Sequence, residues 1–314
     1  MSPDLASHPQ AVIEALAALA GQPRVRQAQE ALREASAELR WNEALRRRWR
    51  EARSESCVRG AVASAAVEGA VVPASLLREC VASGSLSRAV TGDASLDAAA
   101  GLWRAQTRVT QWMAPLRGNQ RPTPPPAAAL LATLHRDVTG PLAAGGRLPL
   151  AEVGAARLEE QAAREGGPGP APHGEELSQR RAALMELLEI EGAPALVRCA
   201  VVHAEMVCAR PFTAGNAAVG RLLVRYLATR DGLEPTGVAV PDLYAARAPG
   251  AYAQALAAYA TGSLEGVVSW IVWQAEALLL GIQEAQAVCR AVQAGTTALA
   301  APPGQPGGQG SHGA

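Results

Sequence analysis

Apolar residues recur along most of the chain with the spacing of α-helices. In the stretch from Leu264 to Val292 they return every three or four residues and line one side of a long helix. The stretch from Ala195 to Ala209 is apolar on nearly every side, which is typical of a helix at the centre of a bundle. The same spacing predicts further helices over residues 10–19, 25–53, 56–68, 73–82, 95–113, 127–138, 174–191, 216–230 and 250–260. The pattern therefore predicts an all-α, mostly helical protein.

The helix expected over residues 25–53 has two different faces. Trp41, Leu45 and Trp49 fall four residues apart and form one apolar stripe if the helix is continuous. The rest of its surface carries arginines at positions 46, 47, 48, 50 and 53. We interpret these arginines as a solvated charged face.

Breaks between the helices divide the chain into regions. The segment from Gly118 to Pro126 is rich in proline and is interpreted as a linker. Residues 147–172 are the least regular part of the core, and only Leu148 to Val153 resembles a strand. The breaks predict a short N-terminal helix within a flexible segment over residues 1–22, an N-terminal helical region over 23–117, a core domain over 118–290 and a disordered tail over 295–314.

Composition and charge narrow the class of function. The 29 basic side chains of the 314-residue chain balance its 29 acidic ones, and a neutral chain lacks the basic face that nucleic-acid binding needs. Every strong cation is an arginine, which excludes lysine Schiff-base chemistry and a P-loop lysine. We find no stretch long and apolar enough to cross a membrane and no signal-peptide pattern. We therefore expect neither a nucleic-acid nor a membrane partner.

The cysteines favour a reducing compartment. There are five, an odd number, with no C-x-x-C pair, and most of them lie in apolar helical runs. Buried free thiols in the cytoplasm are the simplest interpretation. No pair of histidines or cysteines has the spacing of metal ligands, so no metal site is expected from these residues.

The segment from Arg210 to Arg221 joins the central apolar helix to the next one. Pro211 ends the first helix, and Gly215 permits a tight turn. The second helix begins at Asn216 with free N–H groups aimed at the turn, an arrangement that binds anions. Arg221 lies more than one turn further on and is suited to bidentate phosphate binding. The residues themselves leave two interpretations open: an anion pocket, or an ordinary turn capped by glycine and asparagine.

This segment resembles the signature of the Fic (Fido) family of nucleotidyl transferases, usually His-Pro-Phe-x-Asp/Glu-Gly-Asn-Gly-Arg-x-x-Arg. Upstream, Ser64-Ala65-Ala66-Val67-Glu68-Gly69 is similar to the inhibitory helix pattern of that family, Ser/Thr-x-x-x-Glu-Gly/Asn. The resemblance extends over roughly residues 120–285. It implies a Fic-type helical bundle core with a short β-hairpin flap, preceded by an N-terminal helical extension whose inhibitory helix covers residues 56–69.

In the family, the histidine is the general base that activates a target hydroxyl for attack on ATP, so that AMP is transferred to a protein. The acidic residue holds Mg²⁺, and the Gly-Asn segment and the two arginines hold the phosphates. The inhibitory glutamate pairs with the second arginine. The resemblance thus implies ATP as the nucleotide and a protein as the target.

Several of these positions are altered in this chain. Arg210 stands at the histidine position, and a guanidinium cannot act as a base. Ala214 replaces the acidic residue, which argues against bound Mg²⁺, and alanine also occupies the positions of the second glycine (Ala217) and the first arginine (Ala218). We assign Pro211 and Phe212 to motif packing, Gly215, Asn216, Gly220 and Arg221 to nucleotide binding, and Ser64, Glu68 and Gly69 to inhibition; of these, Gly220 falls at a position that the signature leaves unspecified.

No other histidine is an obvious replacement for the base. His203 lies about two helical turns before Arg210, roughly 10 Å away along the helix, and is interpreted as a core residue. Three hypotheses follow: a Fic pseudoenzyme that binds a nucleotide or a partner, a transferase with altered chemistry, and a purely structural, partner-binding helical domain. The sequence does not determine the oligomeric state.

Overall fold

The computed structural model describes residues 9–87 and 90–297, and the described residues form helices and turns without a strand. The α-helices are α1 (Pro9–Ala20), α2 (Pro23–Arg40), α3 (Glu43–Arg47), α4 (Trp49–Val67), α5 (Ala74–Ala82), α6 (Ala94–Gln111), α7 (Ala127–Ala144), α8 (Gly174–Glu189), α9 (Ala195–Ala209), α10 (Asn216–Arg230), α11 (Asp242–Arg247), α12 (Pro249–Ala260) and α13 (Leu264–Gln293). Two 3₁₀ turns, η1 (Ser85–Ser87) and η2 (Leu150–Glu152), complete the regular elements. The prediction of an all-α protein is confirmed.

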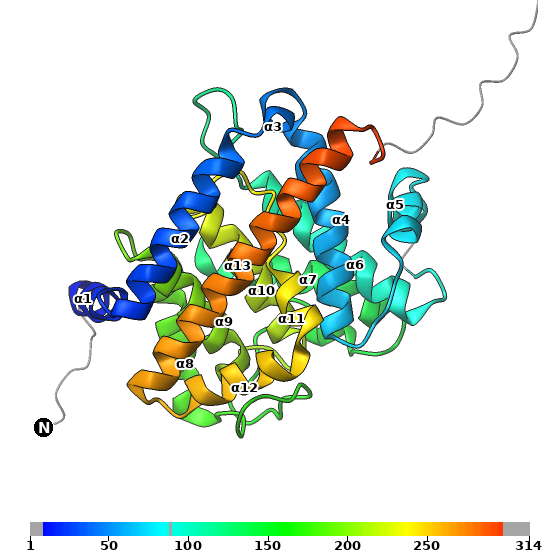
Figure 1. The fold of residues 1–314 in the computed structure, drawn as a ribbon. Helices are drawn as coiled ribbons and strands as arrows, with labels where there is room; N and C mark the ends of the chain where they lie inside the picture. Colours follow the sequence, from blue (N-terminus) through cyan, green and yellow to red (C-terminus); the bar gives the residue numbers. More distant parts are fainter. Residues whose placement is uncertain (1–8, 88–89, 298–314) are drawn as a thin grey trace, which may run out of the picture.

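Helix α9 lies at the centre of the bundle because it has no wide polar face to turn toward water. It packs against α10, to which the motif turn joins it, and against α8, α13 and α1. The long helix α13 runs beside α2 and crosses the bundle (Figure 1), and its Trp270 indole donates a hydrogen bond to the Ala200 carbonyl at 2.7 Å. One apolar core extends from Leu16 in α1 to Val292 in α13.

The expectation that no stretch is long and apolar enough to cross a membrane is wrong for helix α13. By length and composition it could cross a membrane, although we expected no such stretch. In this fold 61% of its apolar window is buried inside the bundle, which is the position of a core helix. The cysteines agree better with expectation, because Cys57, Cys80, Cys199, Cys208 and Cys289 are all free thiols and all except the half-buried Cys80 are buried.

The prediction of one continuous helix over residues 25–53 is wrong. The helix stops at Trp41, and Asn42 begins α3 by accepting a hydrogen bond from the Ala44 N–H through its side chain at 3.0 Å. A second break at Arg48 precedes α4, which includes the helix expected over residues 56–68. Leu45 is buried, but Trp41 is 75% exposed, so the predicted apolar stripe does not form.

The expected β-hairpin flap is also absent from the described residues. The segment 147–173 contains the turn η2 and no strand, including at Leu148–Val153. Its Gly- and Pro-rich sequence contains a single β-branched residue, Val153, and the backbone bonds to the motif turn instead of pairing as strands. Arg157 N–H donates to Pro211 O at 2.7 Å, and Arg164 N–H donates to Thr213 O at 2.7 Å. We call residues 157–172 the cover loop.

Two predictions from the sequence fall partly outside the described residues. These are the flexible segment before α1, of which residues 1–8 are not described, and most of the disordered tail, residues 298–314. The linker over residues 118–126 has no regular secondary structure, as expected. The domain boundaries stay predictions.

Candidate anion site at the start of helix α10

The motif turn is held in shape by a strained residue and a buried amide. Arg210 ends α9 with φ of 48°, and it is the one non-glycine residue with positive φ among residues 9–87 and 90–297. Gly215, at φ of 77°, precedes α10. The Asn216 side chain accepts from the Phe212 N–H at 2.9 Å and donates to the Phe212 carbonyl at 3.0 Å. These contacts place the first N–H groups of α10 beneath the cover loop.

The Arg210 side chain does not point to open solvent. It is 5% exposed, and its Nη2 donates to the carbonyl of Gly169 in the cover loop at 2.6 Å. A Cβ added at Gly167 would lie 3.0 Å from Arg210 Cζ, so the loop passes directly over the guanidinium. Burial lowers the pKa of Arg210, yet a guanidinium still remains charged at physiological pH. The position at which the resemblance implies a general base therefore holds a cation that binds carbonyl oxygens.

Arg157 fastens the cover loop to the end of α9. Its side chain is fully buried, and Nε donates to Arg210 O at 2.8 Å. The terminal nitrogens donate to the carbonyls of Gln161, Pro172 and Ala209 at 2.8, 2.8 and 3.2 Å. Ala209 O is one of the carbonyls that a helix end leaves without a partner in the helix. A single arginine thus ties both ends of the loop to the motif.

Glu165 occupies the anion position at the start of α10. Its Oε2 accepts from the Asn216 N–H at 2.6 Å and from the Asn216 amide at 2.9 Å, and its Oε1 accepts from the Ala217 N–H at 2.9 Å. Burial raises the pKa of Glu165, and the nearby Glu68 carboxylate raises it further. The positive end of a helix and its free N–H groups attract negative charge. A carboxylate of the chain itself therefore occupies the start of α10, and the anion pocket predicted from spacing stays a prediction.

Arg221 lies behind this pocket in α10 and meets the end of α4. It is 3% exposed, and its Nη2 lies 2.6 Å from Glu68 Oε1. Its Nε donates to Ser64 Oγ at 3.0 Å and lies 3.5 Å from Asp242 Oδ1. Burial acts against the charged form, but Glu68, Tyr252 and Asp242 outweigh it and raise the pKa of Arg221. The structure thus brings together the two halves of the inhibitory pair that the resemblance implies, and Gly69 ends that helix with φ of 81°.

One nitrogen of Arg221 is left without a partner. Nη1 is buried and forms no hydrogen bond within the described residues. Gly220, the preceding residue, allows the close approach of α10 to α9, because a Cβ there would lie 2.8 Å from His203 Cδ2. The side chain at the first-arginine position, Ala218, is 2% exposed and offers no cation.

Both ring nitrogens of each buried histidine near the motif lie within hydrogen-bond distance of another group. His135 stacks on Phe212 with ring centroids 3.9 Å apart; its Nδ1 accepts from the Gly154 N–H at 2.9 Å and its Nε2 lies 2.9 Å from Ala214 O. His203 bonds to Gln274 and Tyr252 at 2.8 and 2.9 Å. Burial lowers the pKa of His135 to about 4 and that of His203 to about 3. Both rings are therefore neutral structural groups.

The residues around the turn do not fit Mg²⁺. Ala214 has no side-chain oxygen, and its carbonyl already bonds to His135. Glu152, a carboxylate that contacts Thr213 at 2.5 Å, also pairs with Arg164 at 2.9 Å. Within residues 9–87 and 90–297 no group of three or more His, Cys, Asp or Glu side chains could hold a metal ion.

Sequence reasoning missed three residues of the site: Arg157, Glu165 and Asp242. They lie far from the motif along the chain, and nothing in their local sequence distinguishes them from surface charges. Only the route of the cover loop and of α11 brings them to the motif.

Comparisons with known proteins agree on the fold. No family model and no curated protein sequence matches this chain. Among solved structures it is similar to a Fic family protein from Desulfovibrio desulfuricans G20, with a TM-score of 0.60, 18% identity and coverage of 85% of this chain and 75% of that chain. It is also similar to residues 134–508 of Fic-1 from C. elegans, with a TM-score of 0.58, 18% identity and coverage of 89% and 81%. The chain has the fold of Fic proteins, as its motifs predicted.

Proposed function

We propose that this Fic-fold protein is impaired in nucleotidyl transfer and acts by binding a nucleotide or a protein partner. The observation that carries the proposal is Arg210, which stands where the general base is expected and donates to Gly169 O at 2.6 Å. A guanidinium has no lone pair with which to accept a proton. Loss of a general base alone costs about 10²–10⁴ in rate.

No neighbouring group restores the missing chemistry. Each ring nitrogen of His135 and His203 already has a partner. The acidic position is Ala214, and the cation at the first-arginine position is replaced by Ala218. Transfer of phosphoryl-type groups depends on positioned positive charge, so these losses add to the loss of the base.

The groups that would hold phosphates are present but occupied. Glu165 accepts hydrogen bonds from the backbone N–H groups of Asn216 and Ala217, and Glu68 accepts one from the Arg221 guanidinium. A nucleotide phosphate would have to displace both carboxylates. We therefore expect the wild-type chain to bind ATP weakly and variants without the two carboxylates to bind it more tightly.

Self-labelling with α-labelled ATP and Mg²⁺ tests the loss of transfer. The proteins to compare are wild type, Glu68→Gly and Glu68→Gly/Glu165→Ala, because removal of the carboxylates is the change that would reveal a hidden activity. We expect no acid-stable label on any of them. Label on either variant would overturn the proposal and show that a base has been overlooked.

Asp242 favours a second candidate function, a structural domain in which Arg221 is a packing cation. This buried carboxylate lies 3.5 Å from Arg221 Nε and needs the arginine whether or not a nucleotide binds. Calorimetry with ATP separates the two candidates. Heat of binding in Glu68→Gly/Glu165→Ala supports a nucleotide site, whereas no heat in the folded double variant leaves the structural role.

A further inference from the structure

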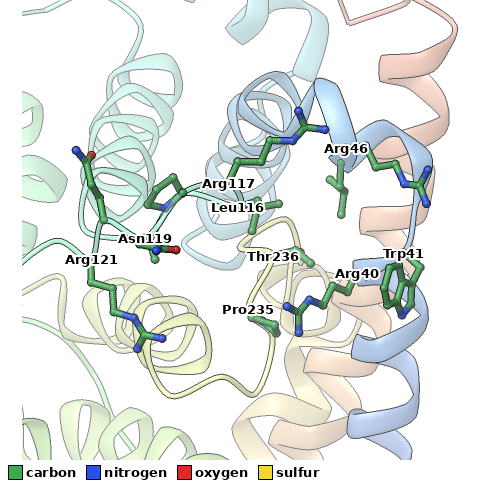
Figure 2. Close-up of a pocket in the computed structure, with 14 residues that line it drawn as sticks. Arg40, Trp41, Arg46, Leu116, Arg117, Asn119, Arg121, Pro235 and Thr236 are labelled. Carbon is green, nitrogen blue, oxygen red and sulfur yellow. The ribbon is translucent and has the colours of Figure 1, made fainter.

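A cavity of about 670 Å³ opens on the surface away from the motif turn. It lies between the end of α2 with α3, the loop 114–121 that follows α6, and the loop 235–236 before α11 (Figure 2). This volume is in the range of ligand sites in proteins. No residue of the motif turn or of the cover loop lines it, so the cavity is separate from the candidate anion site.

The lining of this cavity is strongly basic. Four arginines contribute to it and no aspartate or glutamate does, although the whole chain is neutral. Arg40, Arg117 and Arg121 have no ion pair within the described part of the chain, and Arg46 has only an exposed pair with Glu43 at 3.3 Å. Figure 2 shows Arg121 and Arg40 on opposite sides of the view, with Pro235 between them. Such an excess of unpaired cations attracts acidic ligands.

An exposed tryptophan stands at the edge of the same cavity. Trp41 is 75% exposed, and its backbone is fixed by hydrogen bonds that end α2. Leu116 and Pro235 add apolar surface beside it. Tryptophan and arginine are the residues most enriched in the energetic centres of protein interfaces.

The cavity continues past Trp41 into a second hollow of about 500 Å³. The two share Arg40, Trp41 and Pro235, and the second adds Arg33. Its single acidic residue, Asp231, is already paired with Arg198 at 2.5 Å and with Arg230 at 2.8 Å. Together the hollows form a groove longer than one small molecule needs, which favours an extended polymer. We call it the arginine groove.

We propose that the arginine groove binds an extended, acidic segment of a partner protein. Its carboxylates would pair with Arg40 and Arg121, and an apolar side chain would rest on Trp41. Arginine suits this role because its planar fork binds carboxylates in a bidentate way. The mixture of cations with Trp41, Leu116 and Pro235 matches a peptide of acidic and apolar residues better than it matches a nucleotide, which offers no aliphatic side chain.

Fluorescence anisotropy with a labelled peptide of glutamates and interspersed leucines tests the proposal at low salt. We expect saturable binding that weakens as salt is added. The double variant Arg40→Ser/Arg121→Ser should lose about tenfold in affinity, and Trp41→Ala should also lose affinity. Arg26→Ser is the matched control, because Arg26 is an exposed arginine of the same helix α2 that lines neither hollow.

Three outcomes would overturn the proposal. The first is no binding of the peptide, and the second is an equal loss of affinity in Arg26→Ser and in the double variant. The third is tighter binding of a single-stranded oligonucleotide of equal charge, which would assign the groove to nucleic acid. Because the substituted residues are exposed, circular dichroism should show all variants folded.

Discussion

The carboxylate of Glu165 accepts hydrogen bonds from both the backbone N–H and the side-chain amide of Asn216, at 2.6 and 2.9 Å. Asn216 is the first residue of α10, where a Fic protein is expected to bind phosphate. The contact joins the cover loop to the motif turn through two hydrogen bonds to a carboxylate. It places a negative group of the chain at the position where we propose that phosphate binds.

Replacement of Glu165 by alanine should open this position. If the wild-type site is open about one tenth of the time, the apparent Kd for ATP should fall about tenfold when the internal competitor is removed. Isothermal titration calorimetry measures the change. Glu160→Ala is the control, because Glu160 is exposed in the same loop and has the same charge. Equal affinity in wild type and Glu165→Ala would show that the carboxylate does not block the site.

Arg221 and Glu68 should differ in their effect on stability, although they form one ion pair. Glu68 is 37% exposed, so water can replace part of its pairing. Loss of Arg221 leaves the fully buried Asp242 carboxylate without its cation, and breaking a buried pair in this way costs about 3–5 kcal/mol. Urea unfolding should therefore show a much larger loss for Arg221→Ala than for Glu68→Ala.

Asp242 provides the control for this prediction. In Arg221→Ala/Asp242→Asn the unpaired carboxylate that remains is Glu68, which is 37% exposed and can be solvated, so the double variant should recover part of the stability lost in Arg221→Ala. If both single variants at positions 68 and 221 lower the free energy of unfolding equally, the buried contact with Asp242 is not the reason for the asymmetry. Equal losses are what a packing ion pair between Glu68 and Arg221 alone predicts.

Arg157 should be required to hold the cover loop. Arg157→Met leaves the carbonyls of Ala209, Arg210, Gln161 and Pro172 without their donor, and unpaired buried polar groups cost about 1–3 kcal/mol each. We expect a loss of about 3 kcal/mol or more and faster hydrogen exchange over residues 157–172. Arg164→Met is the matched control: Arg164 is 56% exposed, and solvent screening leaves its pair with Glu152 little effect on stability. Similar losses in both variants would contradict a fastening role for Arg157.

The sequence predicts best where one local pattern fixes the outcome. The continuous apolar run of α9 and the glycine and asparagine after Ala214 gave the bounds of α9 and α10 without error. The spacing of Trp41, Leu45 and Trp49 is that of one continuous helix, so the sequence analysis missed the break at Trp41. In the structure Asn42 caps a new helix. Glu165 could not be found from sequence, because a glutamate in a Gly- and Pro-rich loop has the local signature of a surface residue. Its role depends on where the loop crosses the motif.

Acid should destabilise the fold through its buried histidines. An ordinary histidine has a pKa of 6.5, whereas burial lowers the pKa of His135 to about 4 and that of His203 to about 3. Between pH 6.5 and pH 4 the unfolded chain therefore binds more protons than the folded chain. The stability from both groups is complete above pH 6.5 and is lost as the pH falls, with a slope of up to about 1.4 kcal/mol per pH unit for each histidine.

Urea unfolding at several pH values measures this slope. His203→Asn should reduce it between pH 6.5 and pH 4 whatever the variant does to absolute stability, because the readout is the change with pH. His173→Gln is the control: His173 is exposed at the start of α8, and its replacement should leave the slope as in wild type. An unchanged slope in His203→Asn would mean that His203 binds protons equally in the folded and unfolded states, which the burial of its ring argues against. The same measurement on His135→Gln would then show whether the ring beneath the motif turn carries the remaining pH dependence.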